Sequence, residues 1–183
     1  MLSPILRTPA LPDIDGRQSL PRVPDCRLVV CGAHGGAGTT TLAALLQPAL
    51  DAGVIQPATA GRTSYAGVNG PLLIACRPTT WSATLATAAV ATLASAGQAV
   101  DALVVIDDGW PETSVAAARY RLLSAQVGAI VRMPFVPALR GCTDPSSIRL
   151  PRRAHGALRR IRSLTAASVR TRPVVKEVSH ERD

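Results

Sequence analysis

Four short, mostly apolar runs lie along the chain, at residues 27–31, 72–76, 102–106 and 127–132. Each run is followed within two residues by a glycine, a proline or a carboxylate. Runs of this length without polar alternation are typical of strands that are buried on both faces of a parallel sheet. The pattern therefore predicts about four buried strands.

The segments between these runs have helical patterns. Residues 39–50 place four apolar side chains on one helical face, and residues 80–96 and 113–125 also favour helices. Residues 51–70 are rich in Gly, Ala and Thr and predict no clear element. Strands that alternate with helices indicate an α/β fold, a mostly parallel sheet with helices on both faces.

The chain has 183 residues, which suits one domain with tails. Five prolines interrupt residues 1–25, so we expect a flexible leader there. Residues 26–167 would form the domain, including a basic C-terminal helix, and residues 168–183 a disordered tail. After the fourth run, the prolines at 134 and 137 should end the strand, because proline lacks a backbone donor.

Composition also restricts the cellular location and the ligand classes expected of the protein. The longest uncharged run, residues 78–100, contains many Thr and Ser residues, so it predicts a soluble helix and no transmembrane segment. The four cysteines lie far apart without metal-ligand or disulfide spacing, which indicates reduced thiols in a cytoplasmic protein. A net charge of +8 favours polyanions, but aromatic residues make up only 3%, too few for a base-stacking platform.

A glycine-rich loop between the first run and the first helix is the most informative segment. Residues 29–42 read Val-Val-Cys-Gly-Ala-His-Gly-Gly-Ala-Gly-Thr-Thr-Thr-Leu. A strand–glycine loop–helix unit turns backbone N–H groups toward an anion, and glycine allows close approach of a phosphate. The alternative is a glycine-rich turn without a ligand.

This loop resembles the deviant Walker A motif of the ParA/MinD family, x-K-G-G-x-G-K-[ST]-T. Gly35, Gly36, Gly38, Thr40 and Thr41 match the motif, whereas His34 and Thr39 stand where the family has its two lysines. The resemblance implies that the loop binds ATP or another nucleoside phosphate with Mg²⁺, and that Thr40 coordinates the metal. Loss of both lysines removes cationic stabilisation of phosphoryl transfer, so we assign no catalytic residue. The expected contact set in the loop is His34, Gly35, Gly36, Ala37, Gly38, Thr39, Thr40 and Thr41.

Two later segments are also similar to this family, so that the resemblance covers residues 27–167. Residues 71–80, which contain Arg77-Pro78-Thr79, resemble a strand, R-P-T and helix unit. Residues 127–140 resemble the last strand and its proline-rich base-binding loop, which implies that Pro134 and Val136 contact the base. Actinobacterial MinD-like proteins linked to type VII secretion have the most similar pattern.

Asp107 has two functional interpretations. In the first, Asp107 is a Walker B carboxylate, which follows a buried run and holds the Mg²⁺ water. In the second, it stands at the position from which the family recognises the base. We favour the second, because one further strand follows and leads into the proline-rich loop. The Walker B segment would then have collapsed into residues 51–70, where the one acid is Asp51. The structural alternative is a carboxylate that caps the next turn.

Residues 149–172 contain eight arginines and no acid. Such a segment predicts salt-dependent binding to DNA, or a helix that buries Leu158, Ile161 and Leu164 and leaves its arginines in solvent. The candidate DNA contacts are Arg152, Arg153, Arg159, Arg160 and Arg162.

Three hypotheses follow. The first is a degenerate ParA/MinD-like protein that binds nucleotide weakly, forms a homodimer and acts by association in partitioning, positioning, or secretion or conjugation support. The second is an adaptor without nucleotide, whose basic segment binds DNA or an acidic protein partner. The third is an active ATPase in which an arginine replaces the lysine.

Overall fold

The computed structural model describes residues 28–55 and 70–171. The expected leader, most of residues 51–70 and residues 172–183 lie outside these ranges. In chain order the elements are β1 (Val29–Gly32), α1 (Thr39–Leu45), β2 (Leu50–Val54), β3 (Leu72–Cys76), α2 (Thr80–Ser95), β4 (Ala102–Ile106), α3 (Ser114–Leu123), β5 (Ile130–Met133), the short 3-10 helices η2 (Pro137–Leu139) and η3 (Pro145–Ser147), and α4 (Arg152–Thr171).

The strands form one parallel sheet in the order β2-β1-β3-β4-β5. The predicted α/β class with a parallel sheet is confirmed, and the described residues contain five strands instead of about four. The additional strand is β2, in a segment for which the sequence predicted no element. It lies at the sheet edge with Asp51, Gly53 and Val54 exposed, so it lacks the continuous apolar run of a buried strand.

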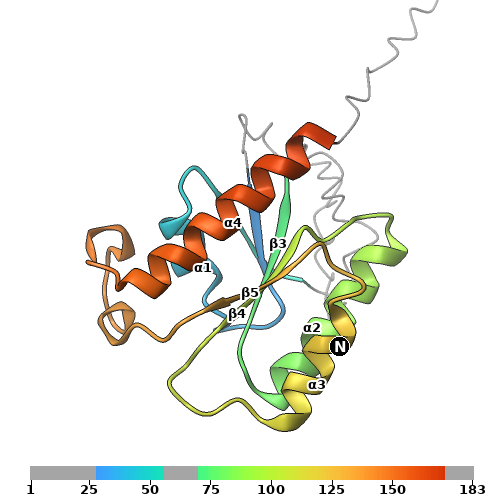
Figure 1. Ribbon diagram of the computed structural model, residues 1–183, viewed down its shortest axis with the longest axis horizontal. Helices are drawn as coiled ribbons and strands as arrows, with labels where there is room; N and C mark the ends of the chain where they lie inside the picture. The colour runs from blue at the N-terminus through green and yellow to red at the C-terminus, as the bar shows by residue number, and fades with distance from the viewer. Residues whose placement is uncertain (1–27, 56–69, 172–183) are drawn as a thin grey trace, which may run out of the picture.

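Helices cover both faces of the sheet, as predicted (Figure 1). Strand residues alternate between two cores. On one face Leu72, Ile74 and Cys76 join the core beneath α2 and α3, and on the other Leu73 and Ala75 join the core beneath α1 and α4. This is the layered arrangement expected of the P-loop NTPase-like class.

Several element boundaries differ from the sequence prediction. Helix α1 ends at Leu45 instead of residue 50, since Pro48 cannot continue a helix. Strand β5 begins at Ile130 instead of residue 127 and ends at Met133, directly before Pro134. Helix α4 continues through residues 168–171, where the sequence predicts the start of a disordered tail. The Ser168 hydroxyl donates to the Asp101 carboxylate.

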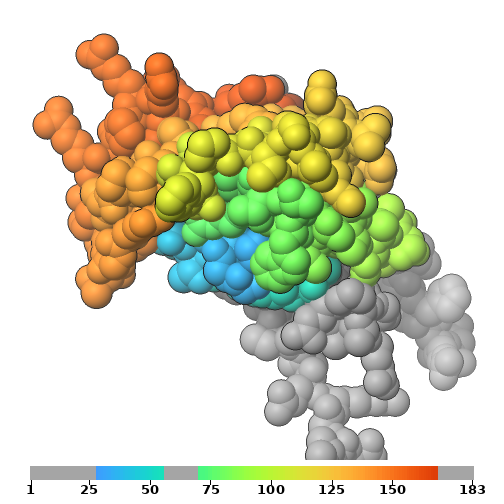
Figure 2. All heavy atoms as spheres, turned by 90° about the horizontal axis from the view of Figure 1, so that it is seen from below, coloured from blue at the N-terminus to red at the C-terminus, as the bar shows by residue number. Residues whose placement is uncertain are grey.

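The order of the strands creates a crevice at the carboxyl end of the sheet. After β1 the chain passes to one face through α1, and after the neighbouring β3 it passes to the other face through α2. Ligands of open α/β sheets bind at such switch points, outside the carboxyl ends of the strands. Figure 2 shows the glycine loop in blue at this edge, beside the segments that follow β3 (green), β4 (olive) and β5 (orange). In the described part of the chain, no helix is long and apolar enough to cross a membrane.

Candidate functional site

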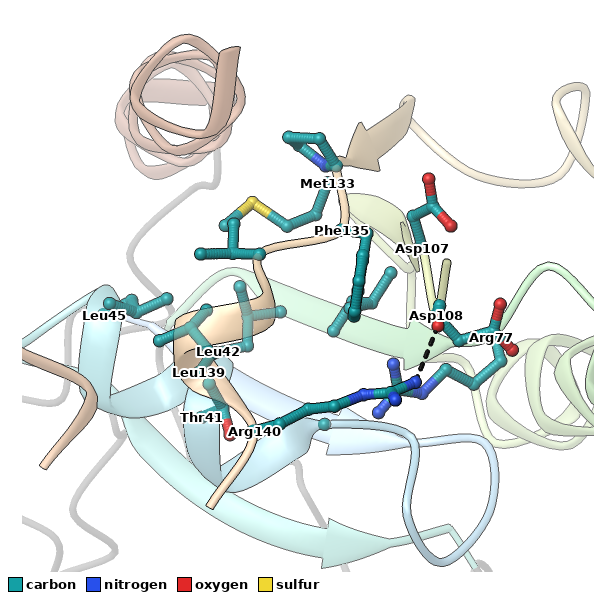
Figure 3. A pocket seen from close by; sticks show the side chains of 14 residues that line it. Thr41, Leu42, Leu45, Arg77, Asp107, Asp108, Met133, Phe135, Leu139 and Arg140 are labelled. Carbon is teal, nitrogen blue, oxygen red and sulfur yellow. Dashed lines mark hydrogen bonds between the residues drawn. The ribbon is translucent and has the colours of Figure 1, made fainter. Parts of the chain in front are cut away.

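A cavity of about 150 Å³ lies at the carboxyl edge of the sheet, between α1 and the segment that follows β5 (Figure 3). Cavities for complete drug-sized ligands are roughly 300–1,000 Å³, so this one suits a single ring system with the rest of the ligand outside. Its lining comes from five separate parts of the chain: Gly38, Thr41, Leu42 and Leu45; Arg77; Ile106, Asp107 and Asp108; Met133, Pro134, Phe135 and Val136; Leu139 and Arg140.

The glycine loop borders this cavity at Gly38. Gly36 and Gly38 have φ angles of 77° and 93°, a left-handed conformation that other residues rarely adopt. Within the described residues, no acceptor contacts the backbone N–H groups of Gly35, Gly36, Gly38, Thr39 and Thr40. A run of such donors in a left-handed loop is the geometry that binds anions.

Arg77 places a positive charge at the glycine loop. Its Nε donates to the Gly36 carbonyl at 3.1 Å, and its side chain also lines the cavity. A methyl group at Gly38 would lie 3.8 Å from one of the guanidinium nitrogens. The sequence indicated Arg77 only as part of the R-P-T unit, because the contact joins residues that are 41 positions apart.

His34, at the signature-lysine position and in the expected contact set of the loop, is buried. Its Nδ1 lies 2.7 Å from the Gly35 carbonyl and its Nε2 2.8 Å from the Ser82 hydroxyl. The Ser82 oxygen also accepts from the Arg77 N–H at 2.7 Å, so its own hydrogen is left for His34. The ring also lies against Trp81, with 4.7 Å between centroids. We conclude that His34 fixes the loop.

Thr39 and Thr40 take opposite positions at the start of α1. Thr39, in place of the second lysine, is buried, and its hydroxyl lies against Gly32, where a Cβ would be only 2.6 Å away. Thr40 is exposed, and its hydroxyl donates to the Asp51 carboxylate at 2.6 Å. No contact in the described residues joins Thr40 to Asp107, the other expected metal ligand. The carboxylate beside Thr40 is Asp51.

Asp107 lies at the end of β4 and lines the cavity. Its Oδ1 accepts from the Gly109 N–H at 2.9 Å, so it caps the following turn, which was the structural alternative. In the described residues Oδ2 has no hydrogen-bond donor. This oxygen can still accept a hydrogen bond from a ligand in the cavity.

The loop that follows β5 forms the opposite wall of the cavity. Pro134 and Val136 both line it, and Phe135 packs against Gly109 with ring atoms 3.1 Å from the position a Cβ would take. Arg140 lies over the Phe135 ring at 4.8 Å and donates to the Asp108 carbonyl at 2.8 Å. In Figure 3 the Arg140 and Arg77 side chains point into the same cavity from opposite sides.

Below the loop, Tyr120 and Cys76 occupy the core under α2 and α3. The Tyr120 hydroxyl donates to the Arg77 carbonyl. Burial raises the pKa of the Cys76 thiol to about 12 and raises the pKa of Tyr120 well above its ordinary value. Both groups therefore stay neutral at physiological pH.

The predicted packing face of the C-terminal helix is confirmed. Leu158 and Ile161 are buried against the sheet, with Leu164 partly buried beside them. Arg162 donates to the Leu45 carbonyl at the end of α1, at 2.9 Å. The five arginines expected to contact DNA are exposed and are spread around the outer half of α4, with Arg153 and Arg160 beside β5.

Comparisons with models of protein families, with curated proteins and with solved structures found no significant match. In the described residues, no group of three or more His, Cys, Asp or Glu side chains could hold a metal ion.

Proposed function

We propose that this protein binds a nucleoside phosphate, with the phosphates on the glycine loop and the base in the adjoining cavity. The observation that carries this proposal is the meeting of three elements at one edge of the sheet. They are a left-handed loop whose N–H donors have no acceptor among the described residues, a guanidinium group on that loop, and a ring-sized cavity.

Each part of the cavity suits one part of such a ligand. Pro134 and Val136 offer apolar contact to a base. Oδ2 of Asp107, which has no donor in the described part of the chain, accepts a hydrogen bond from an exocyclic amine or ring N–H. This arrangement favours the base-recognising interpretation of Asp107 over the Walker B interpretation.

Arg77 would supply the positive charge that the family obtains from lysine. A guanidinium pairs with phosphate oxygens and stays charged at all relevant pH values. Thr40 and Asp51 fit Mg²⁺, which usually takes one or two protein ligands together with phosphate oxygens and water. The bound ion would neutralise phosphate charge.

We expect association without efficient turnover, in the manner of a degenerate ParA/MinD-like protein in the cytoplasm. Arg77 already uses its Nε to hold the Gly36 carbonyl. Apart from Asp51, which already accepts from Thr40 and Gly53, no carboxylate contacts the loop in the described residues, so nothing is placed to activate a water molecule. Phosphate release should therefore stay at the background rate.

Calorimetric titration with ATP, ADP and GTP, with and without Mg²⁺, tests the proposal. We expect dissociation constants in the micromolar to millimolar range, on the order of −8 to −4 kcal/mol. Arg77→Ala should weaken binding about 10- to 100-fold, because a hydrogen bond to a charged group contributes about 1.5–3 kcal/mol. Arg152→Ala, which removes an exposed charge on α4, should leave it unchanged.

Two results would decide against the proposal. Absence of heat with every nucleotide at millimolar concentration would favour the adaptor hypothesis. Rapid phosphate release that Arg77→Ala abolishes would favour the ATPase hypothesis, with Arg77 as the arginine that replaces the lysine.

A further inference from the structure

A second concave surface lies away from the glycine loop, along β5. This groove has a volume of about 560 Å³ and runs between α3 and α4. Tyr120 and Arg121 of α3, with Ser124 directly after that helix, form one wall. Arg153, Gly156, Ala157 and Arg160 of α4 form the other. Ile130, Val131 and Arg132 of β5 form its floor.

The strand in this groove, β5, is the last strand of the described sheet. β5 pairs with β4 on one side, and no described strand lies on its other side. Leu103 and Asp107 of the β4 segment donate to the carbonyls of Ala129 and Met133. In a parallel ladder the backbone groups alternate in direction, so the N–H and C=O groups of Ile130 and Arg132 point toward the open edge.

The groove is also strongly basic. Among the described residues, four arginines and no acid line it. Arg132 forms an exposed ion pair with Glu112 at 2.8 Å, an interaction of small net stability. Within the described residues, no carboxylate pairs with Arg121, Arg153 or Arg160.

We propose that this groove binds an acidic, extended peptide segment of a partner protein, which adds to β5 as a sixth strand. Successive side chains of an added strand point to opposite faces of the sheet, so acidic residues would meet Arg121 on the α3 wall and Arg153 and Arg160 on the α4 wall. The strand edge supplies backbone hydrogen bonds and the arginines supply selectivity for acidic sequences.

Two features favour a peptide over other occupants. A nucleic acid offers acceptors but few hydrogen-bond donors, whereas the β5 edge presents carbonyls as well as N–H groups. Among the described residues, the one aromatic side chain in the groove is that of Tyr120, which is 1% exposed and unable to stack on a base. Pairing of β5 with a second copy of this chain would bring two arginine-lined edges together, so their charges would repel.

Fluorescence anisotropy with the full chain tests this inference. The probe is a labelled peptide of about ten residues that repeats Glu-Glu-Val, a length that suits one strand. We expect saturable binding without nucleotide, and at least tenfold weaker binding by the double variant Arg153→Glu/Arg160→Glu, because two attractive charges become repulsive. The matched control is Arg152→Glu/Arg159→Glu, which makes the same charge change at the same spacing on the outward face of α4 and should bind nearly as well.

Strand addition is separated from simple charge attraction by a peptide of the same sequence with N-methyl groups on its central amides, which cannot pair with β5. This peptide should not bind, and binding of the unmodified peptide should slow hydrogen exchange at the amides of Ile130 and Arg132. Equal binding of the methylated peptide, equal loss in both double variants, or binding of labelled duplex DNA in place of the peptide would each overturn the proposal. Because the assay contains no nucleotide, these outcomes do not bear on nucleotide binding.

Discussion

The two faces of the sheet differ in what they contribute to the candidate site. Under α2 and α3, buried hydrogen bonds connect His34, Ser82, Tyr120 and the backbone of Arg77. Under α1, the face instead opens into the cavity beside Gly38. One face therefore holds the loops in position, and the other provides space for a ligand.

This difference shows how a small domain can form a ligand site from loops. The glycine loop is exposed at Gly35 and Gly36 and could move freely if only its own bonds held it. His34 and Arg77 attach it to the rigid core, and loops with satisfied buried polar groups are held more firmly than exposed ones. The core beneath α2 and α3 thus sets the geometry on the opposite face.

The largest effect is expected from Tyr120→Ala. Tyr120 is fully buried, and truncation of a buried aromatic side chain leaves a cavity that costs about 3–5 kcal/mol in the free energy of unfolding. Urea unfolding followed by circular dichroism measures this change. Tyr120→Phe should cost only about 1 kcal/mol, since it removes the hydrogen bond to the Arg77 carbonyl and keeps the ring. Equal losses in the two variants would show that the hydroxyl, and not the ring, carries the stability.

An intermediate effect is expected from Ser82→Ala. The substitution leaves both His34 Nε2 and the Arg77 N–H without their buried partner, which should lower the free energy of unfolding by about 1–3 kcal/mol. Ser163→Ala is the control, because that exposed hydroxyl donates to a helix carbonyl on α4. If both variants unfold at the same urea concentration as the unmodified chain, the hydrogen-bond network does not hold the loop.

The smallest effect concerns alkaline pH. The pKa of Cys76 rises from 9.0 in the unfolded chain to about 12 in the fold, so the folded state binds this proton more tightly. Its contribution to stability is complete below pH 9 and is lost as the pH rises from 9 toward about 12. Between pH 8 and pH 10 we expect a loss of about 1 kcal/mol from this group. Thermal unfolding at both pH values measures it. Cys76→Ala should reduce this loss, and Cys142→Ala, at a half-exposed thiol, should not.

Much of the fold follows from local sequence pattern. The apolar runs predicted the buried strands β1, β3 and β4 and the position of β5, which is an edge strand with Arg132 exposed. The segments between the runs predicted the helices. Pro134 directly follows the end of β5, and Pro48 comes three residues after the end of α1. β2 was not predicted, because an edge strand with mostly exposed residues does not need an apolar run.

The sequence by itself determined the α/β class, the glycine loop and the basic face of α4, since each depends on residues that are close together in the chain. Only the tertiary structure decided which side chains meet. It placed Arg77 on the Gly36 carbonyl, Asp51 beside Thr40, and His34 beneath the loop on Ser82. These contacts join separate strands and loops, and their identity depends on strand order. Strand order is set by the burial of two whole cores and is not encoded in any local pattern.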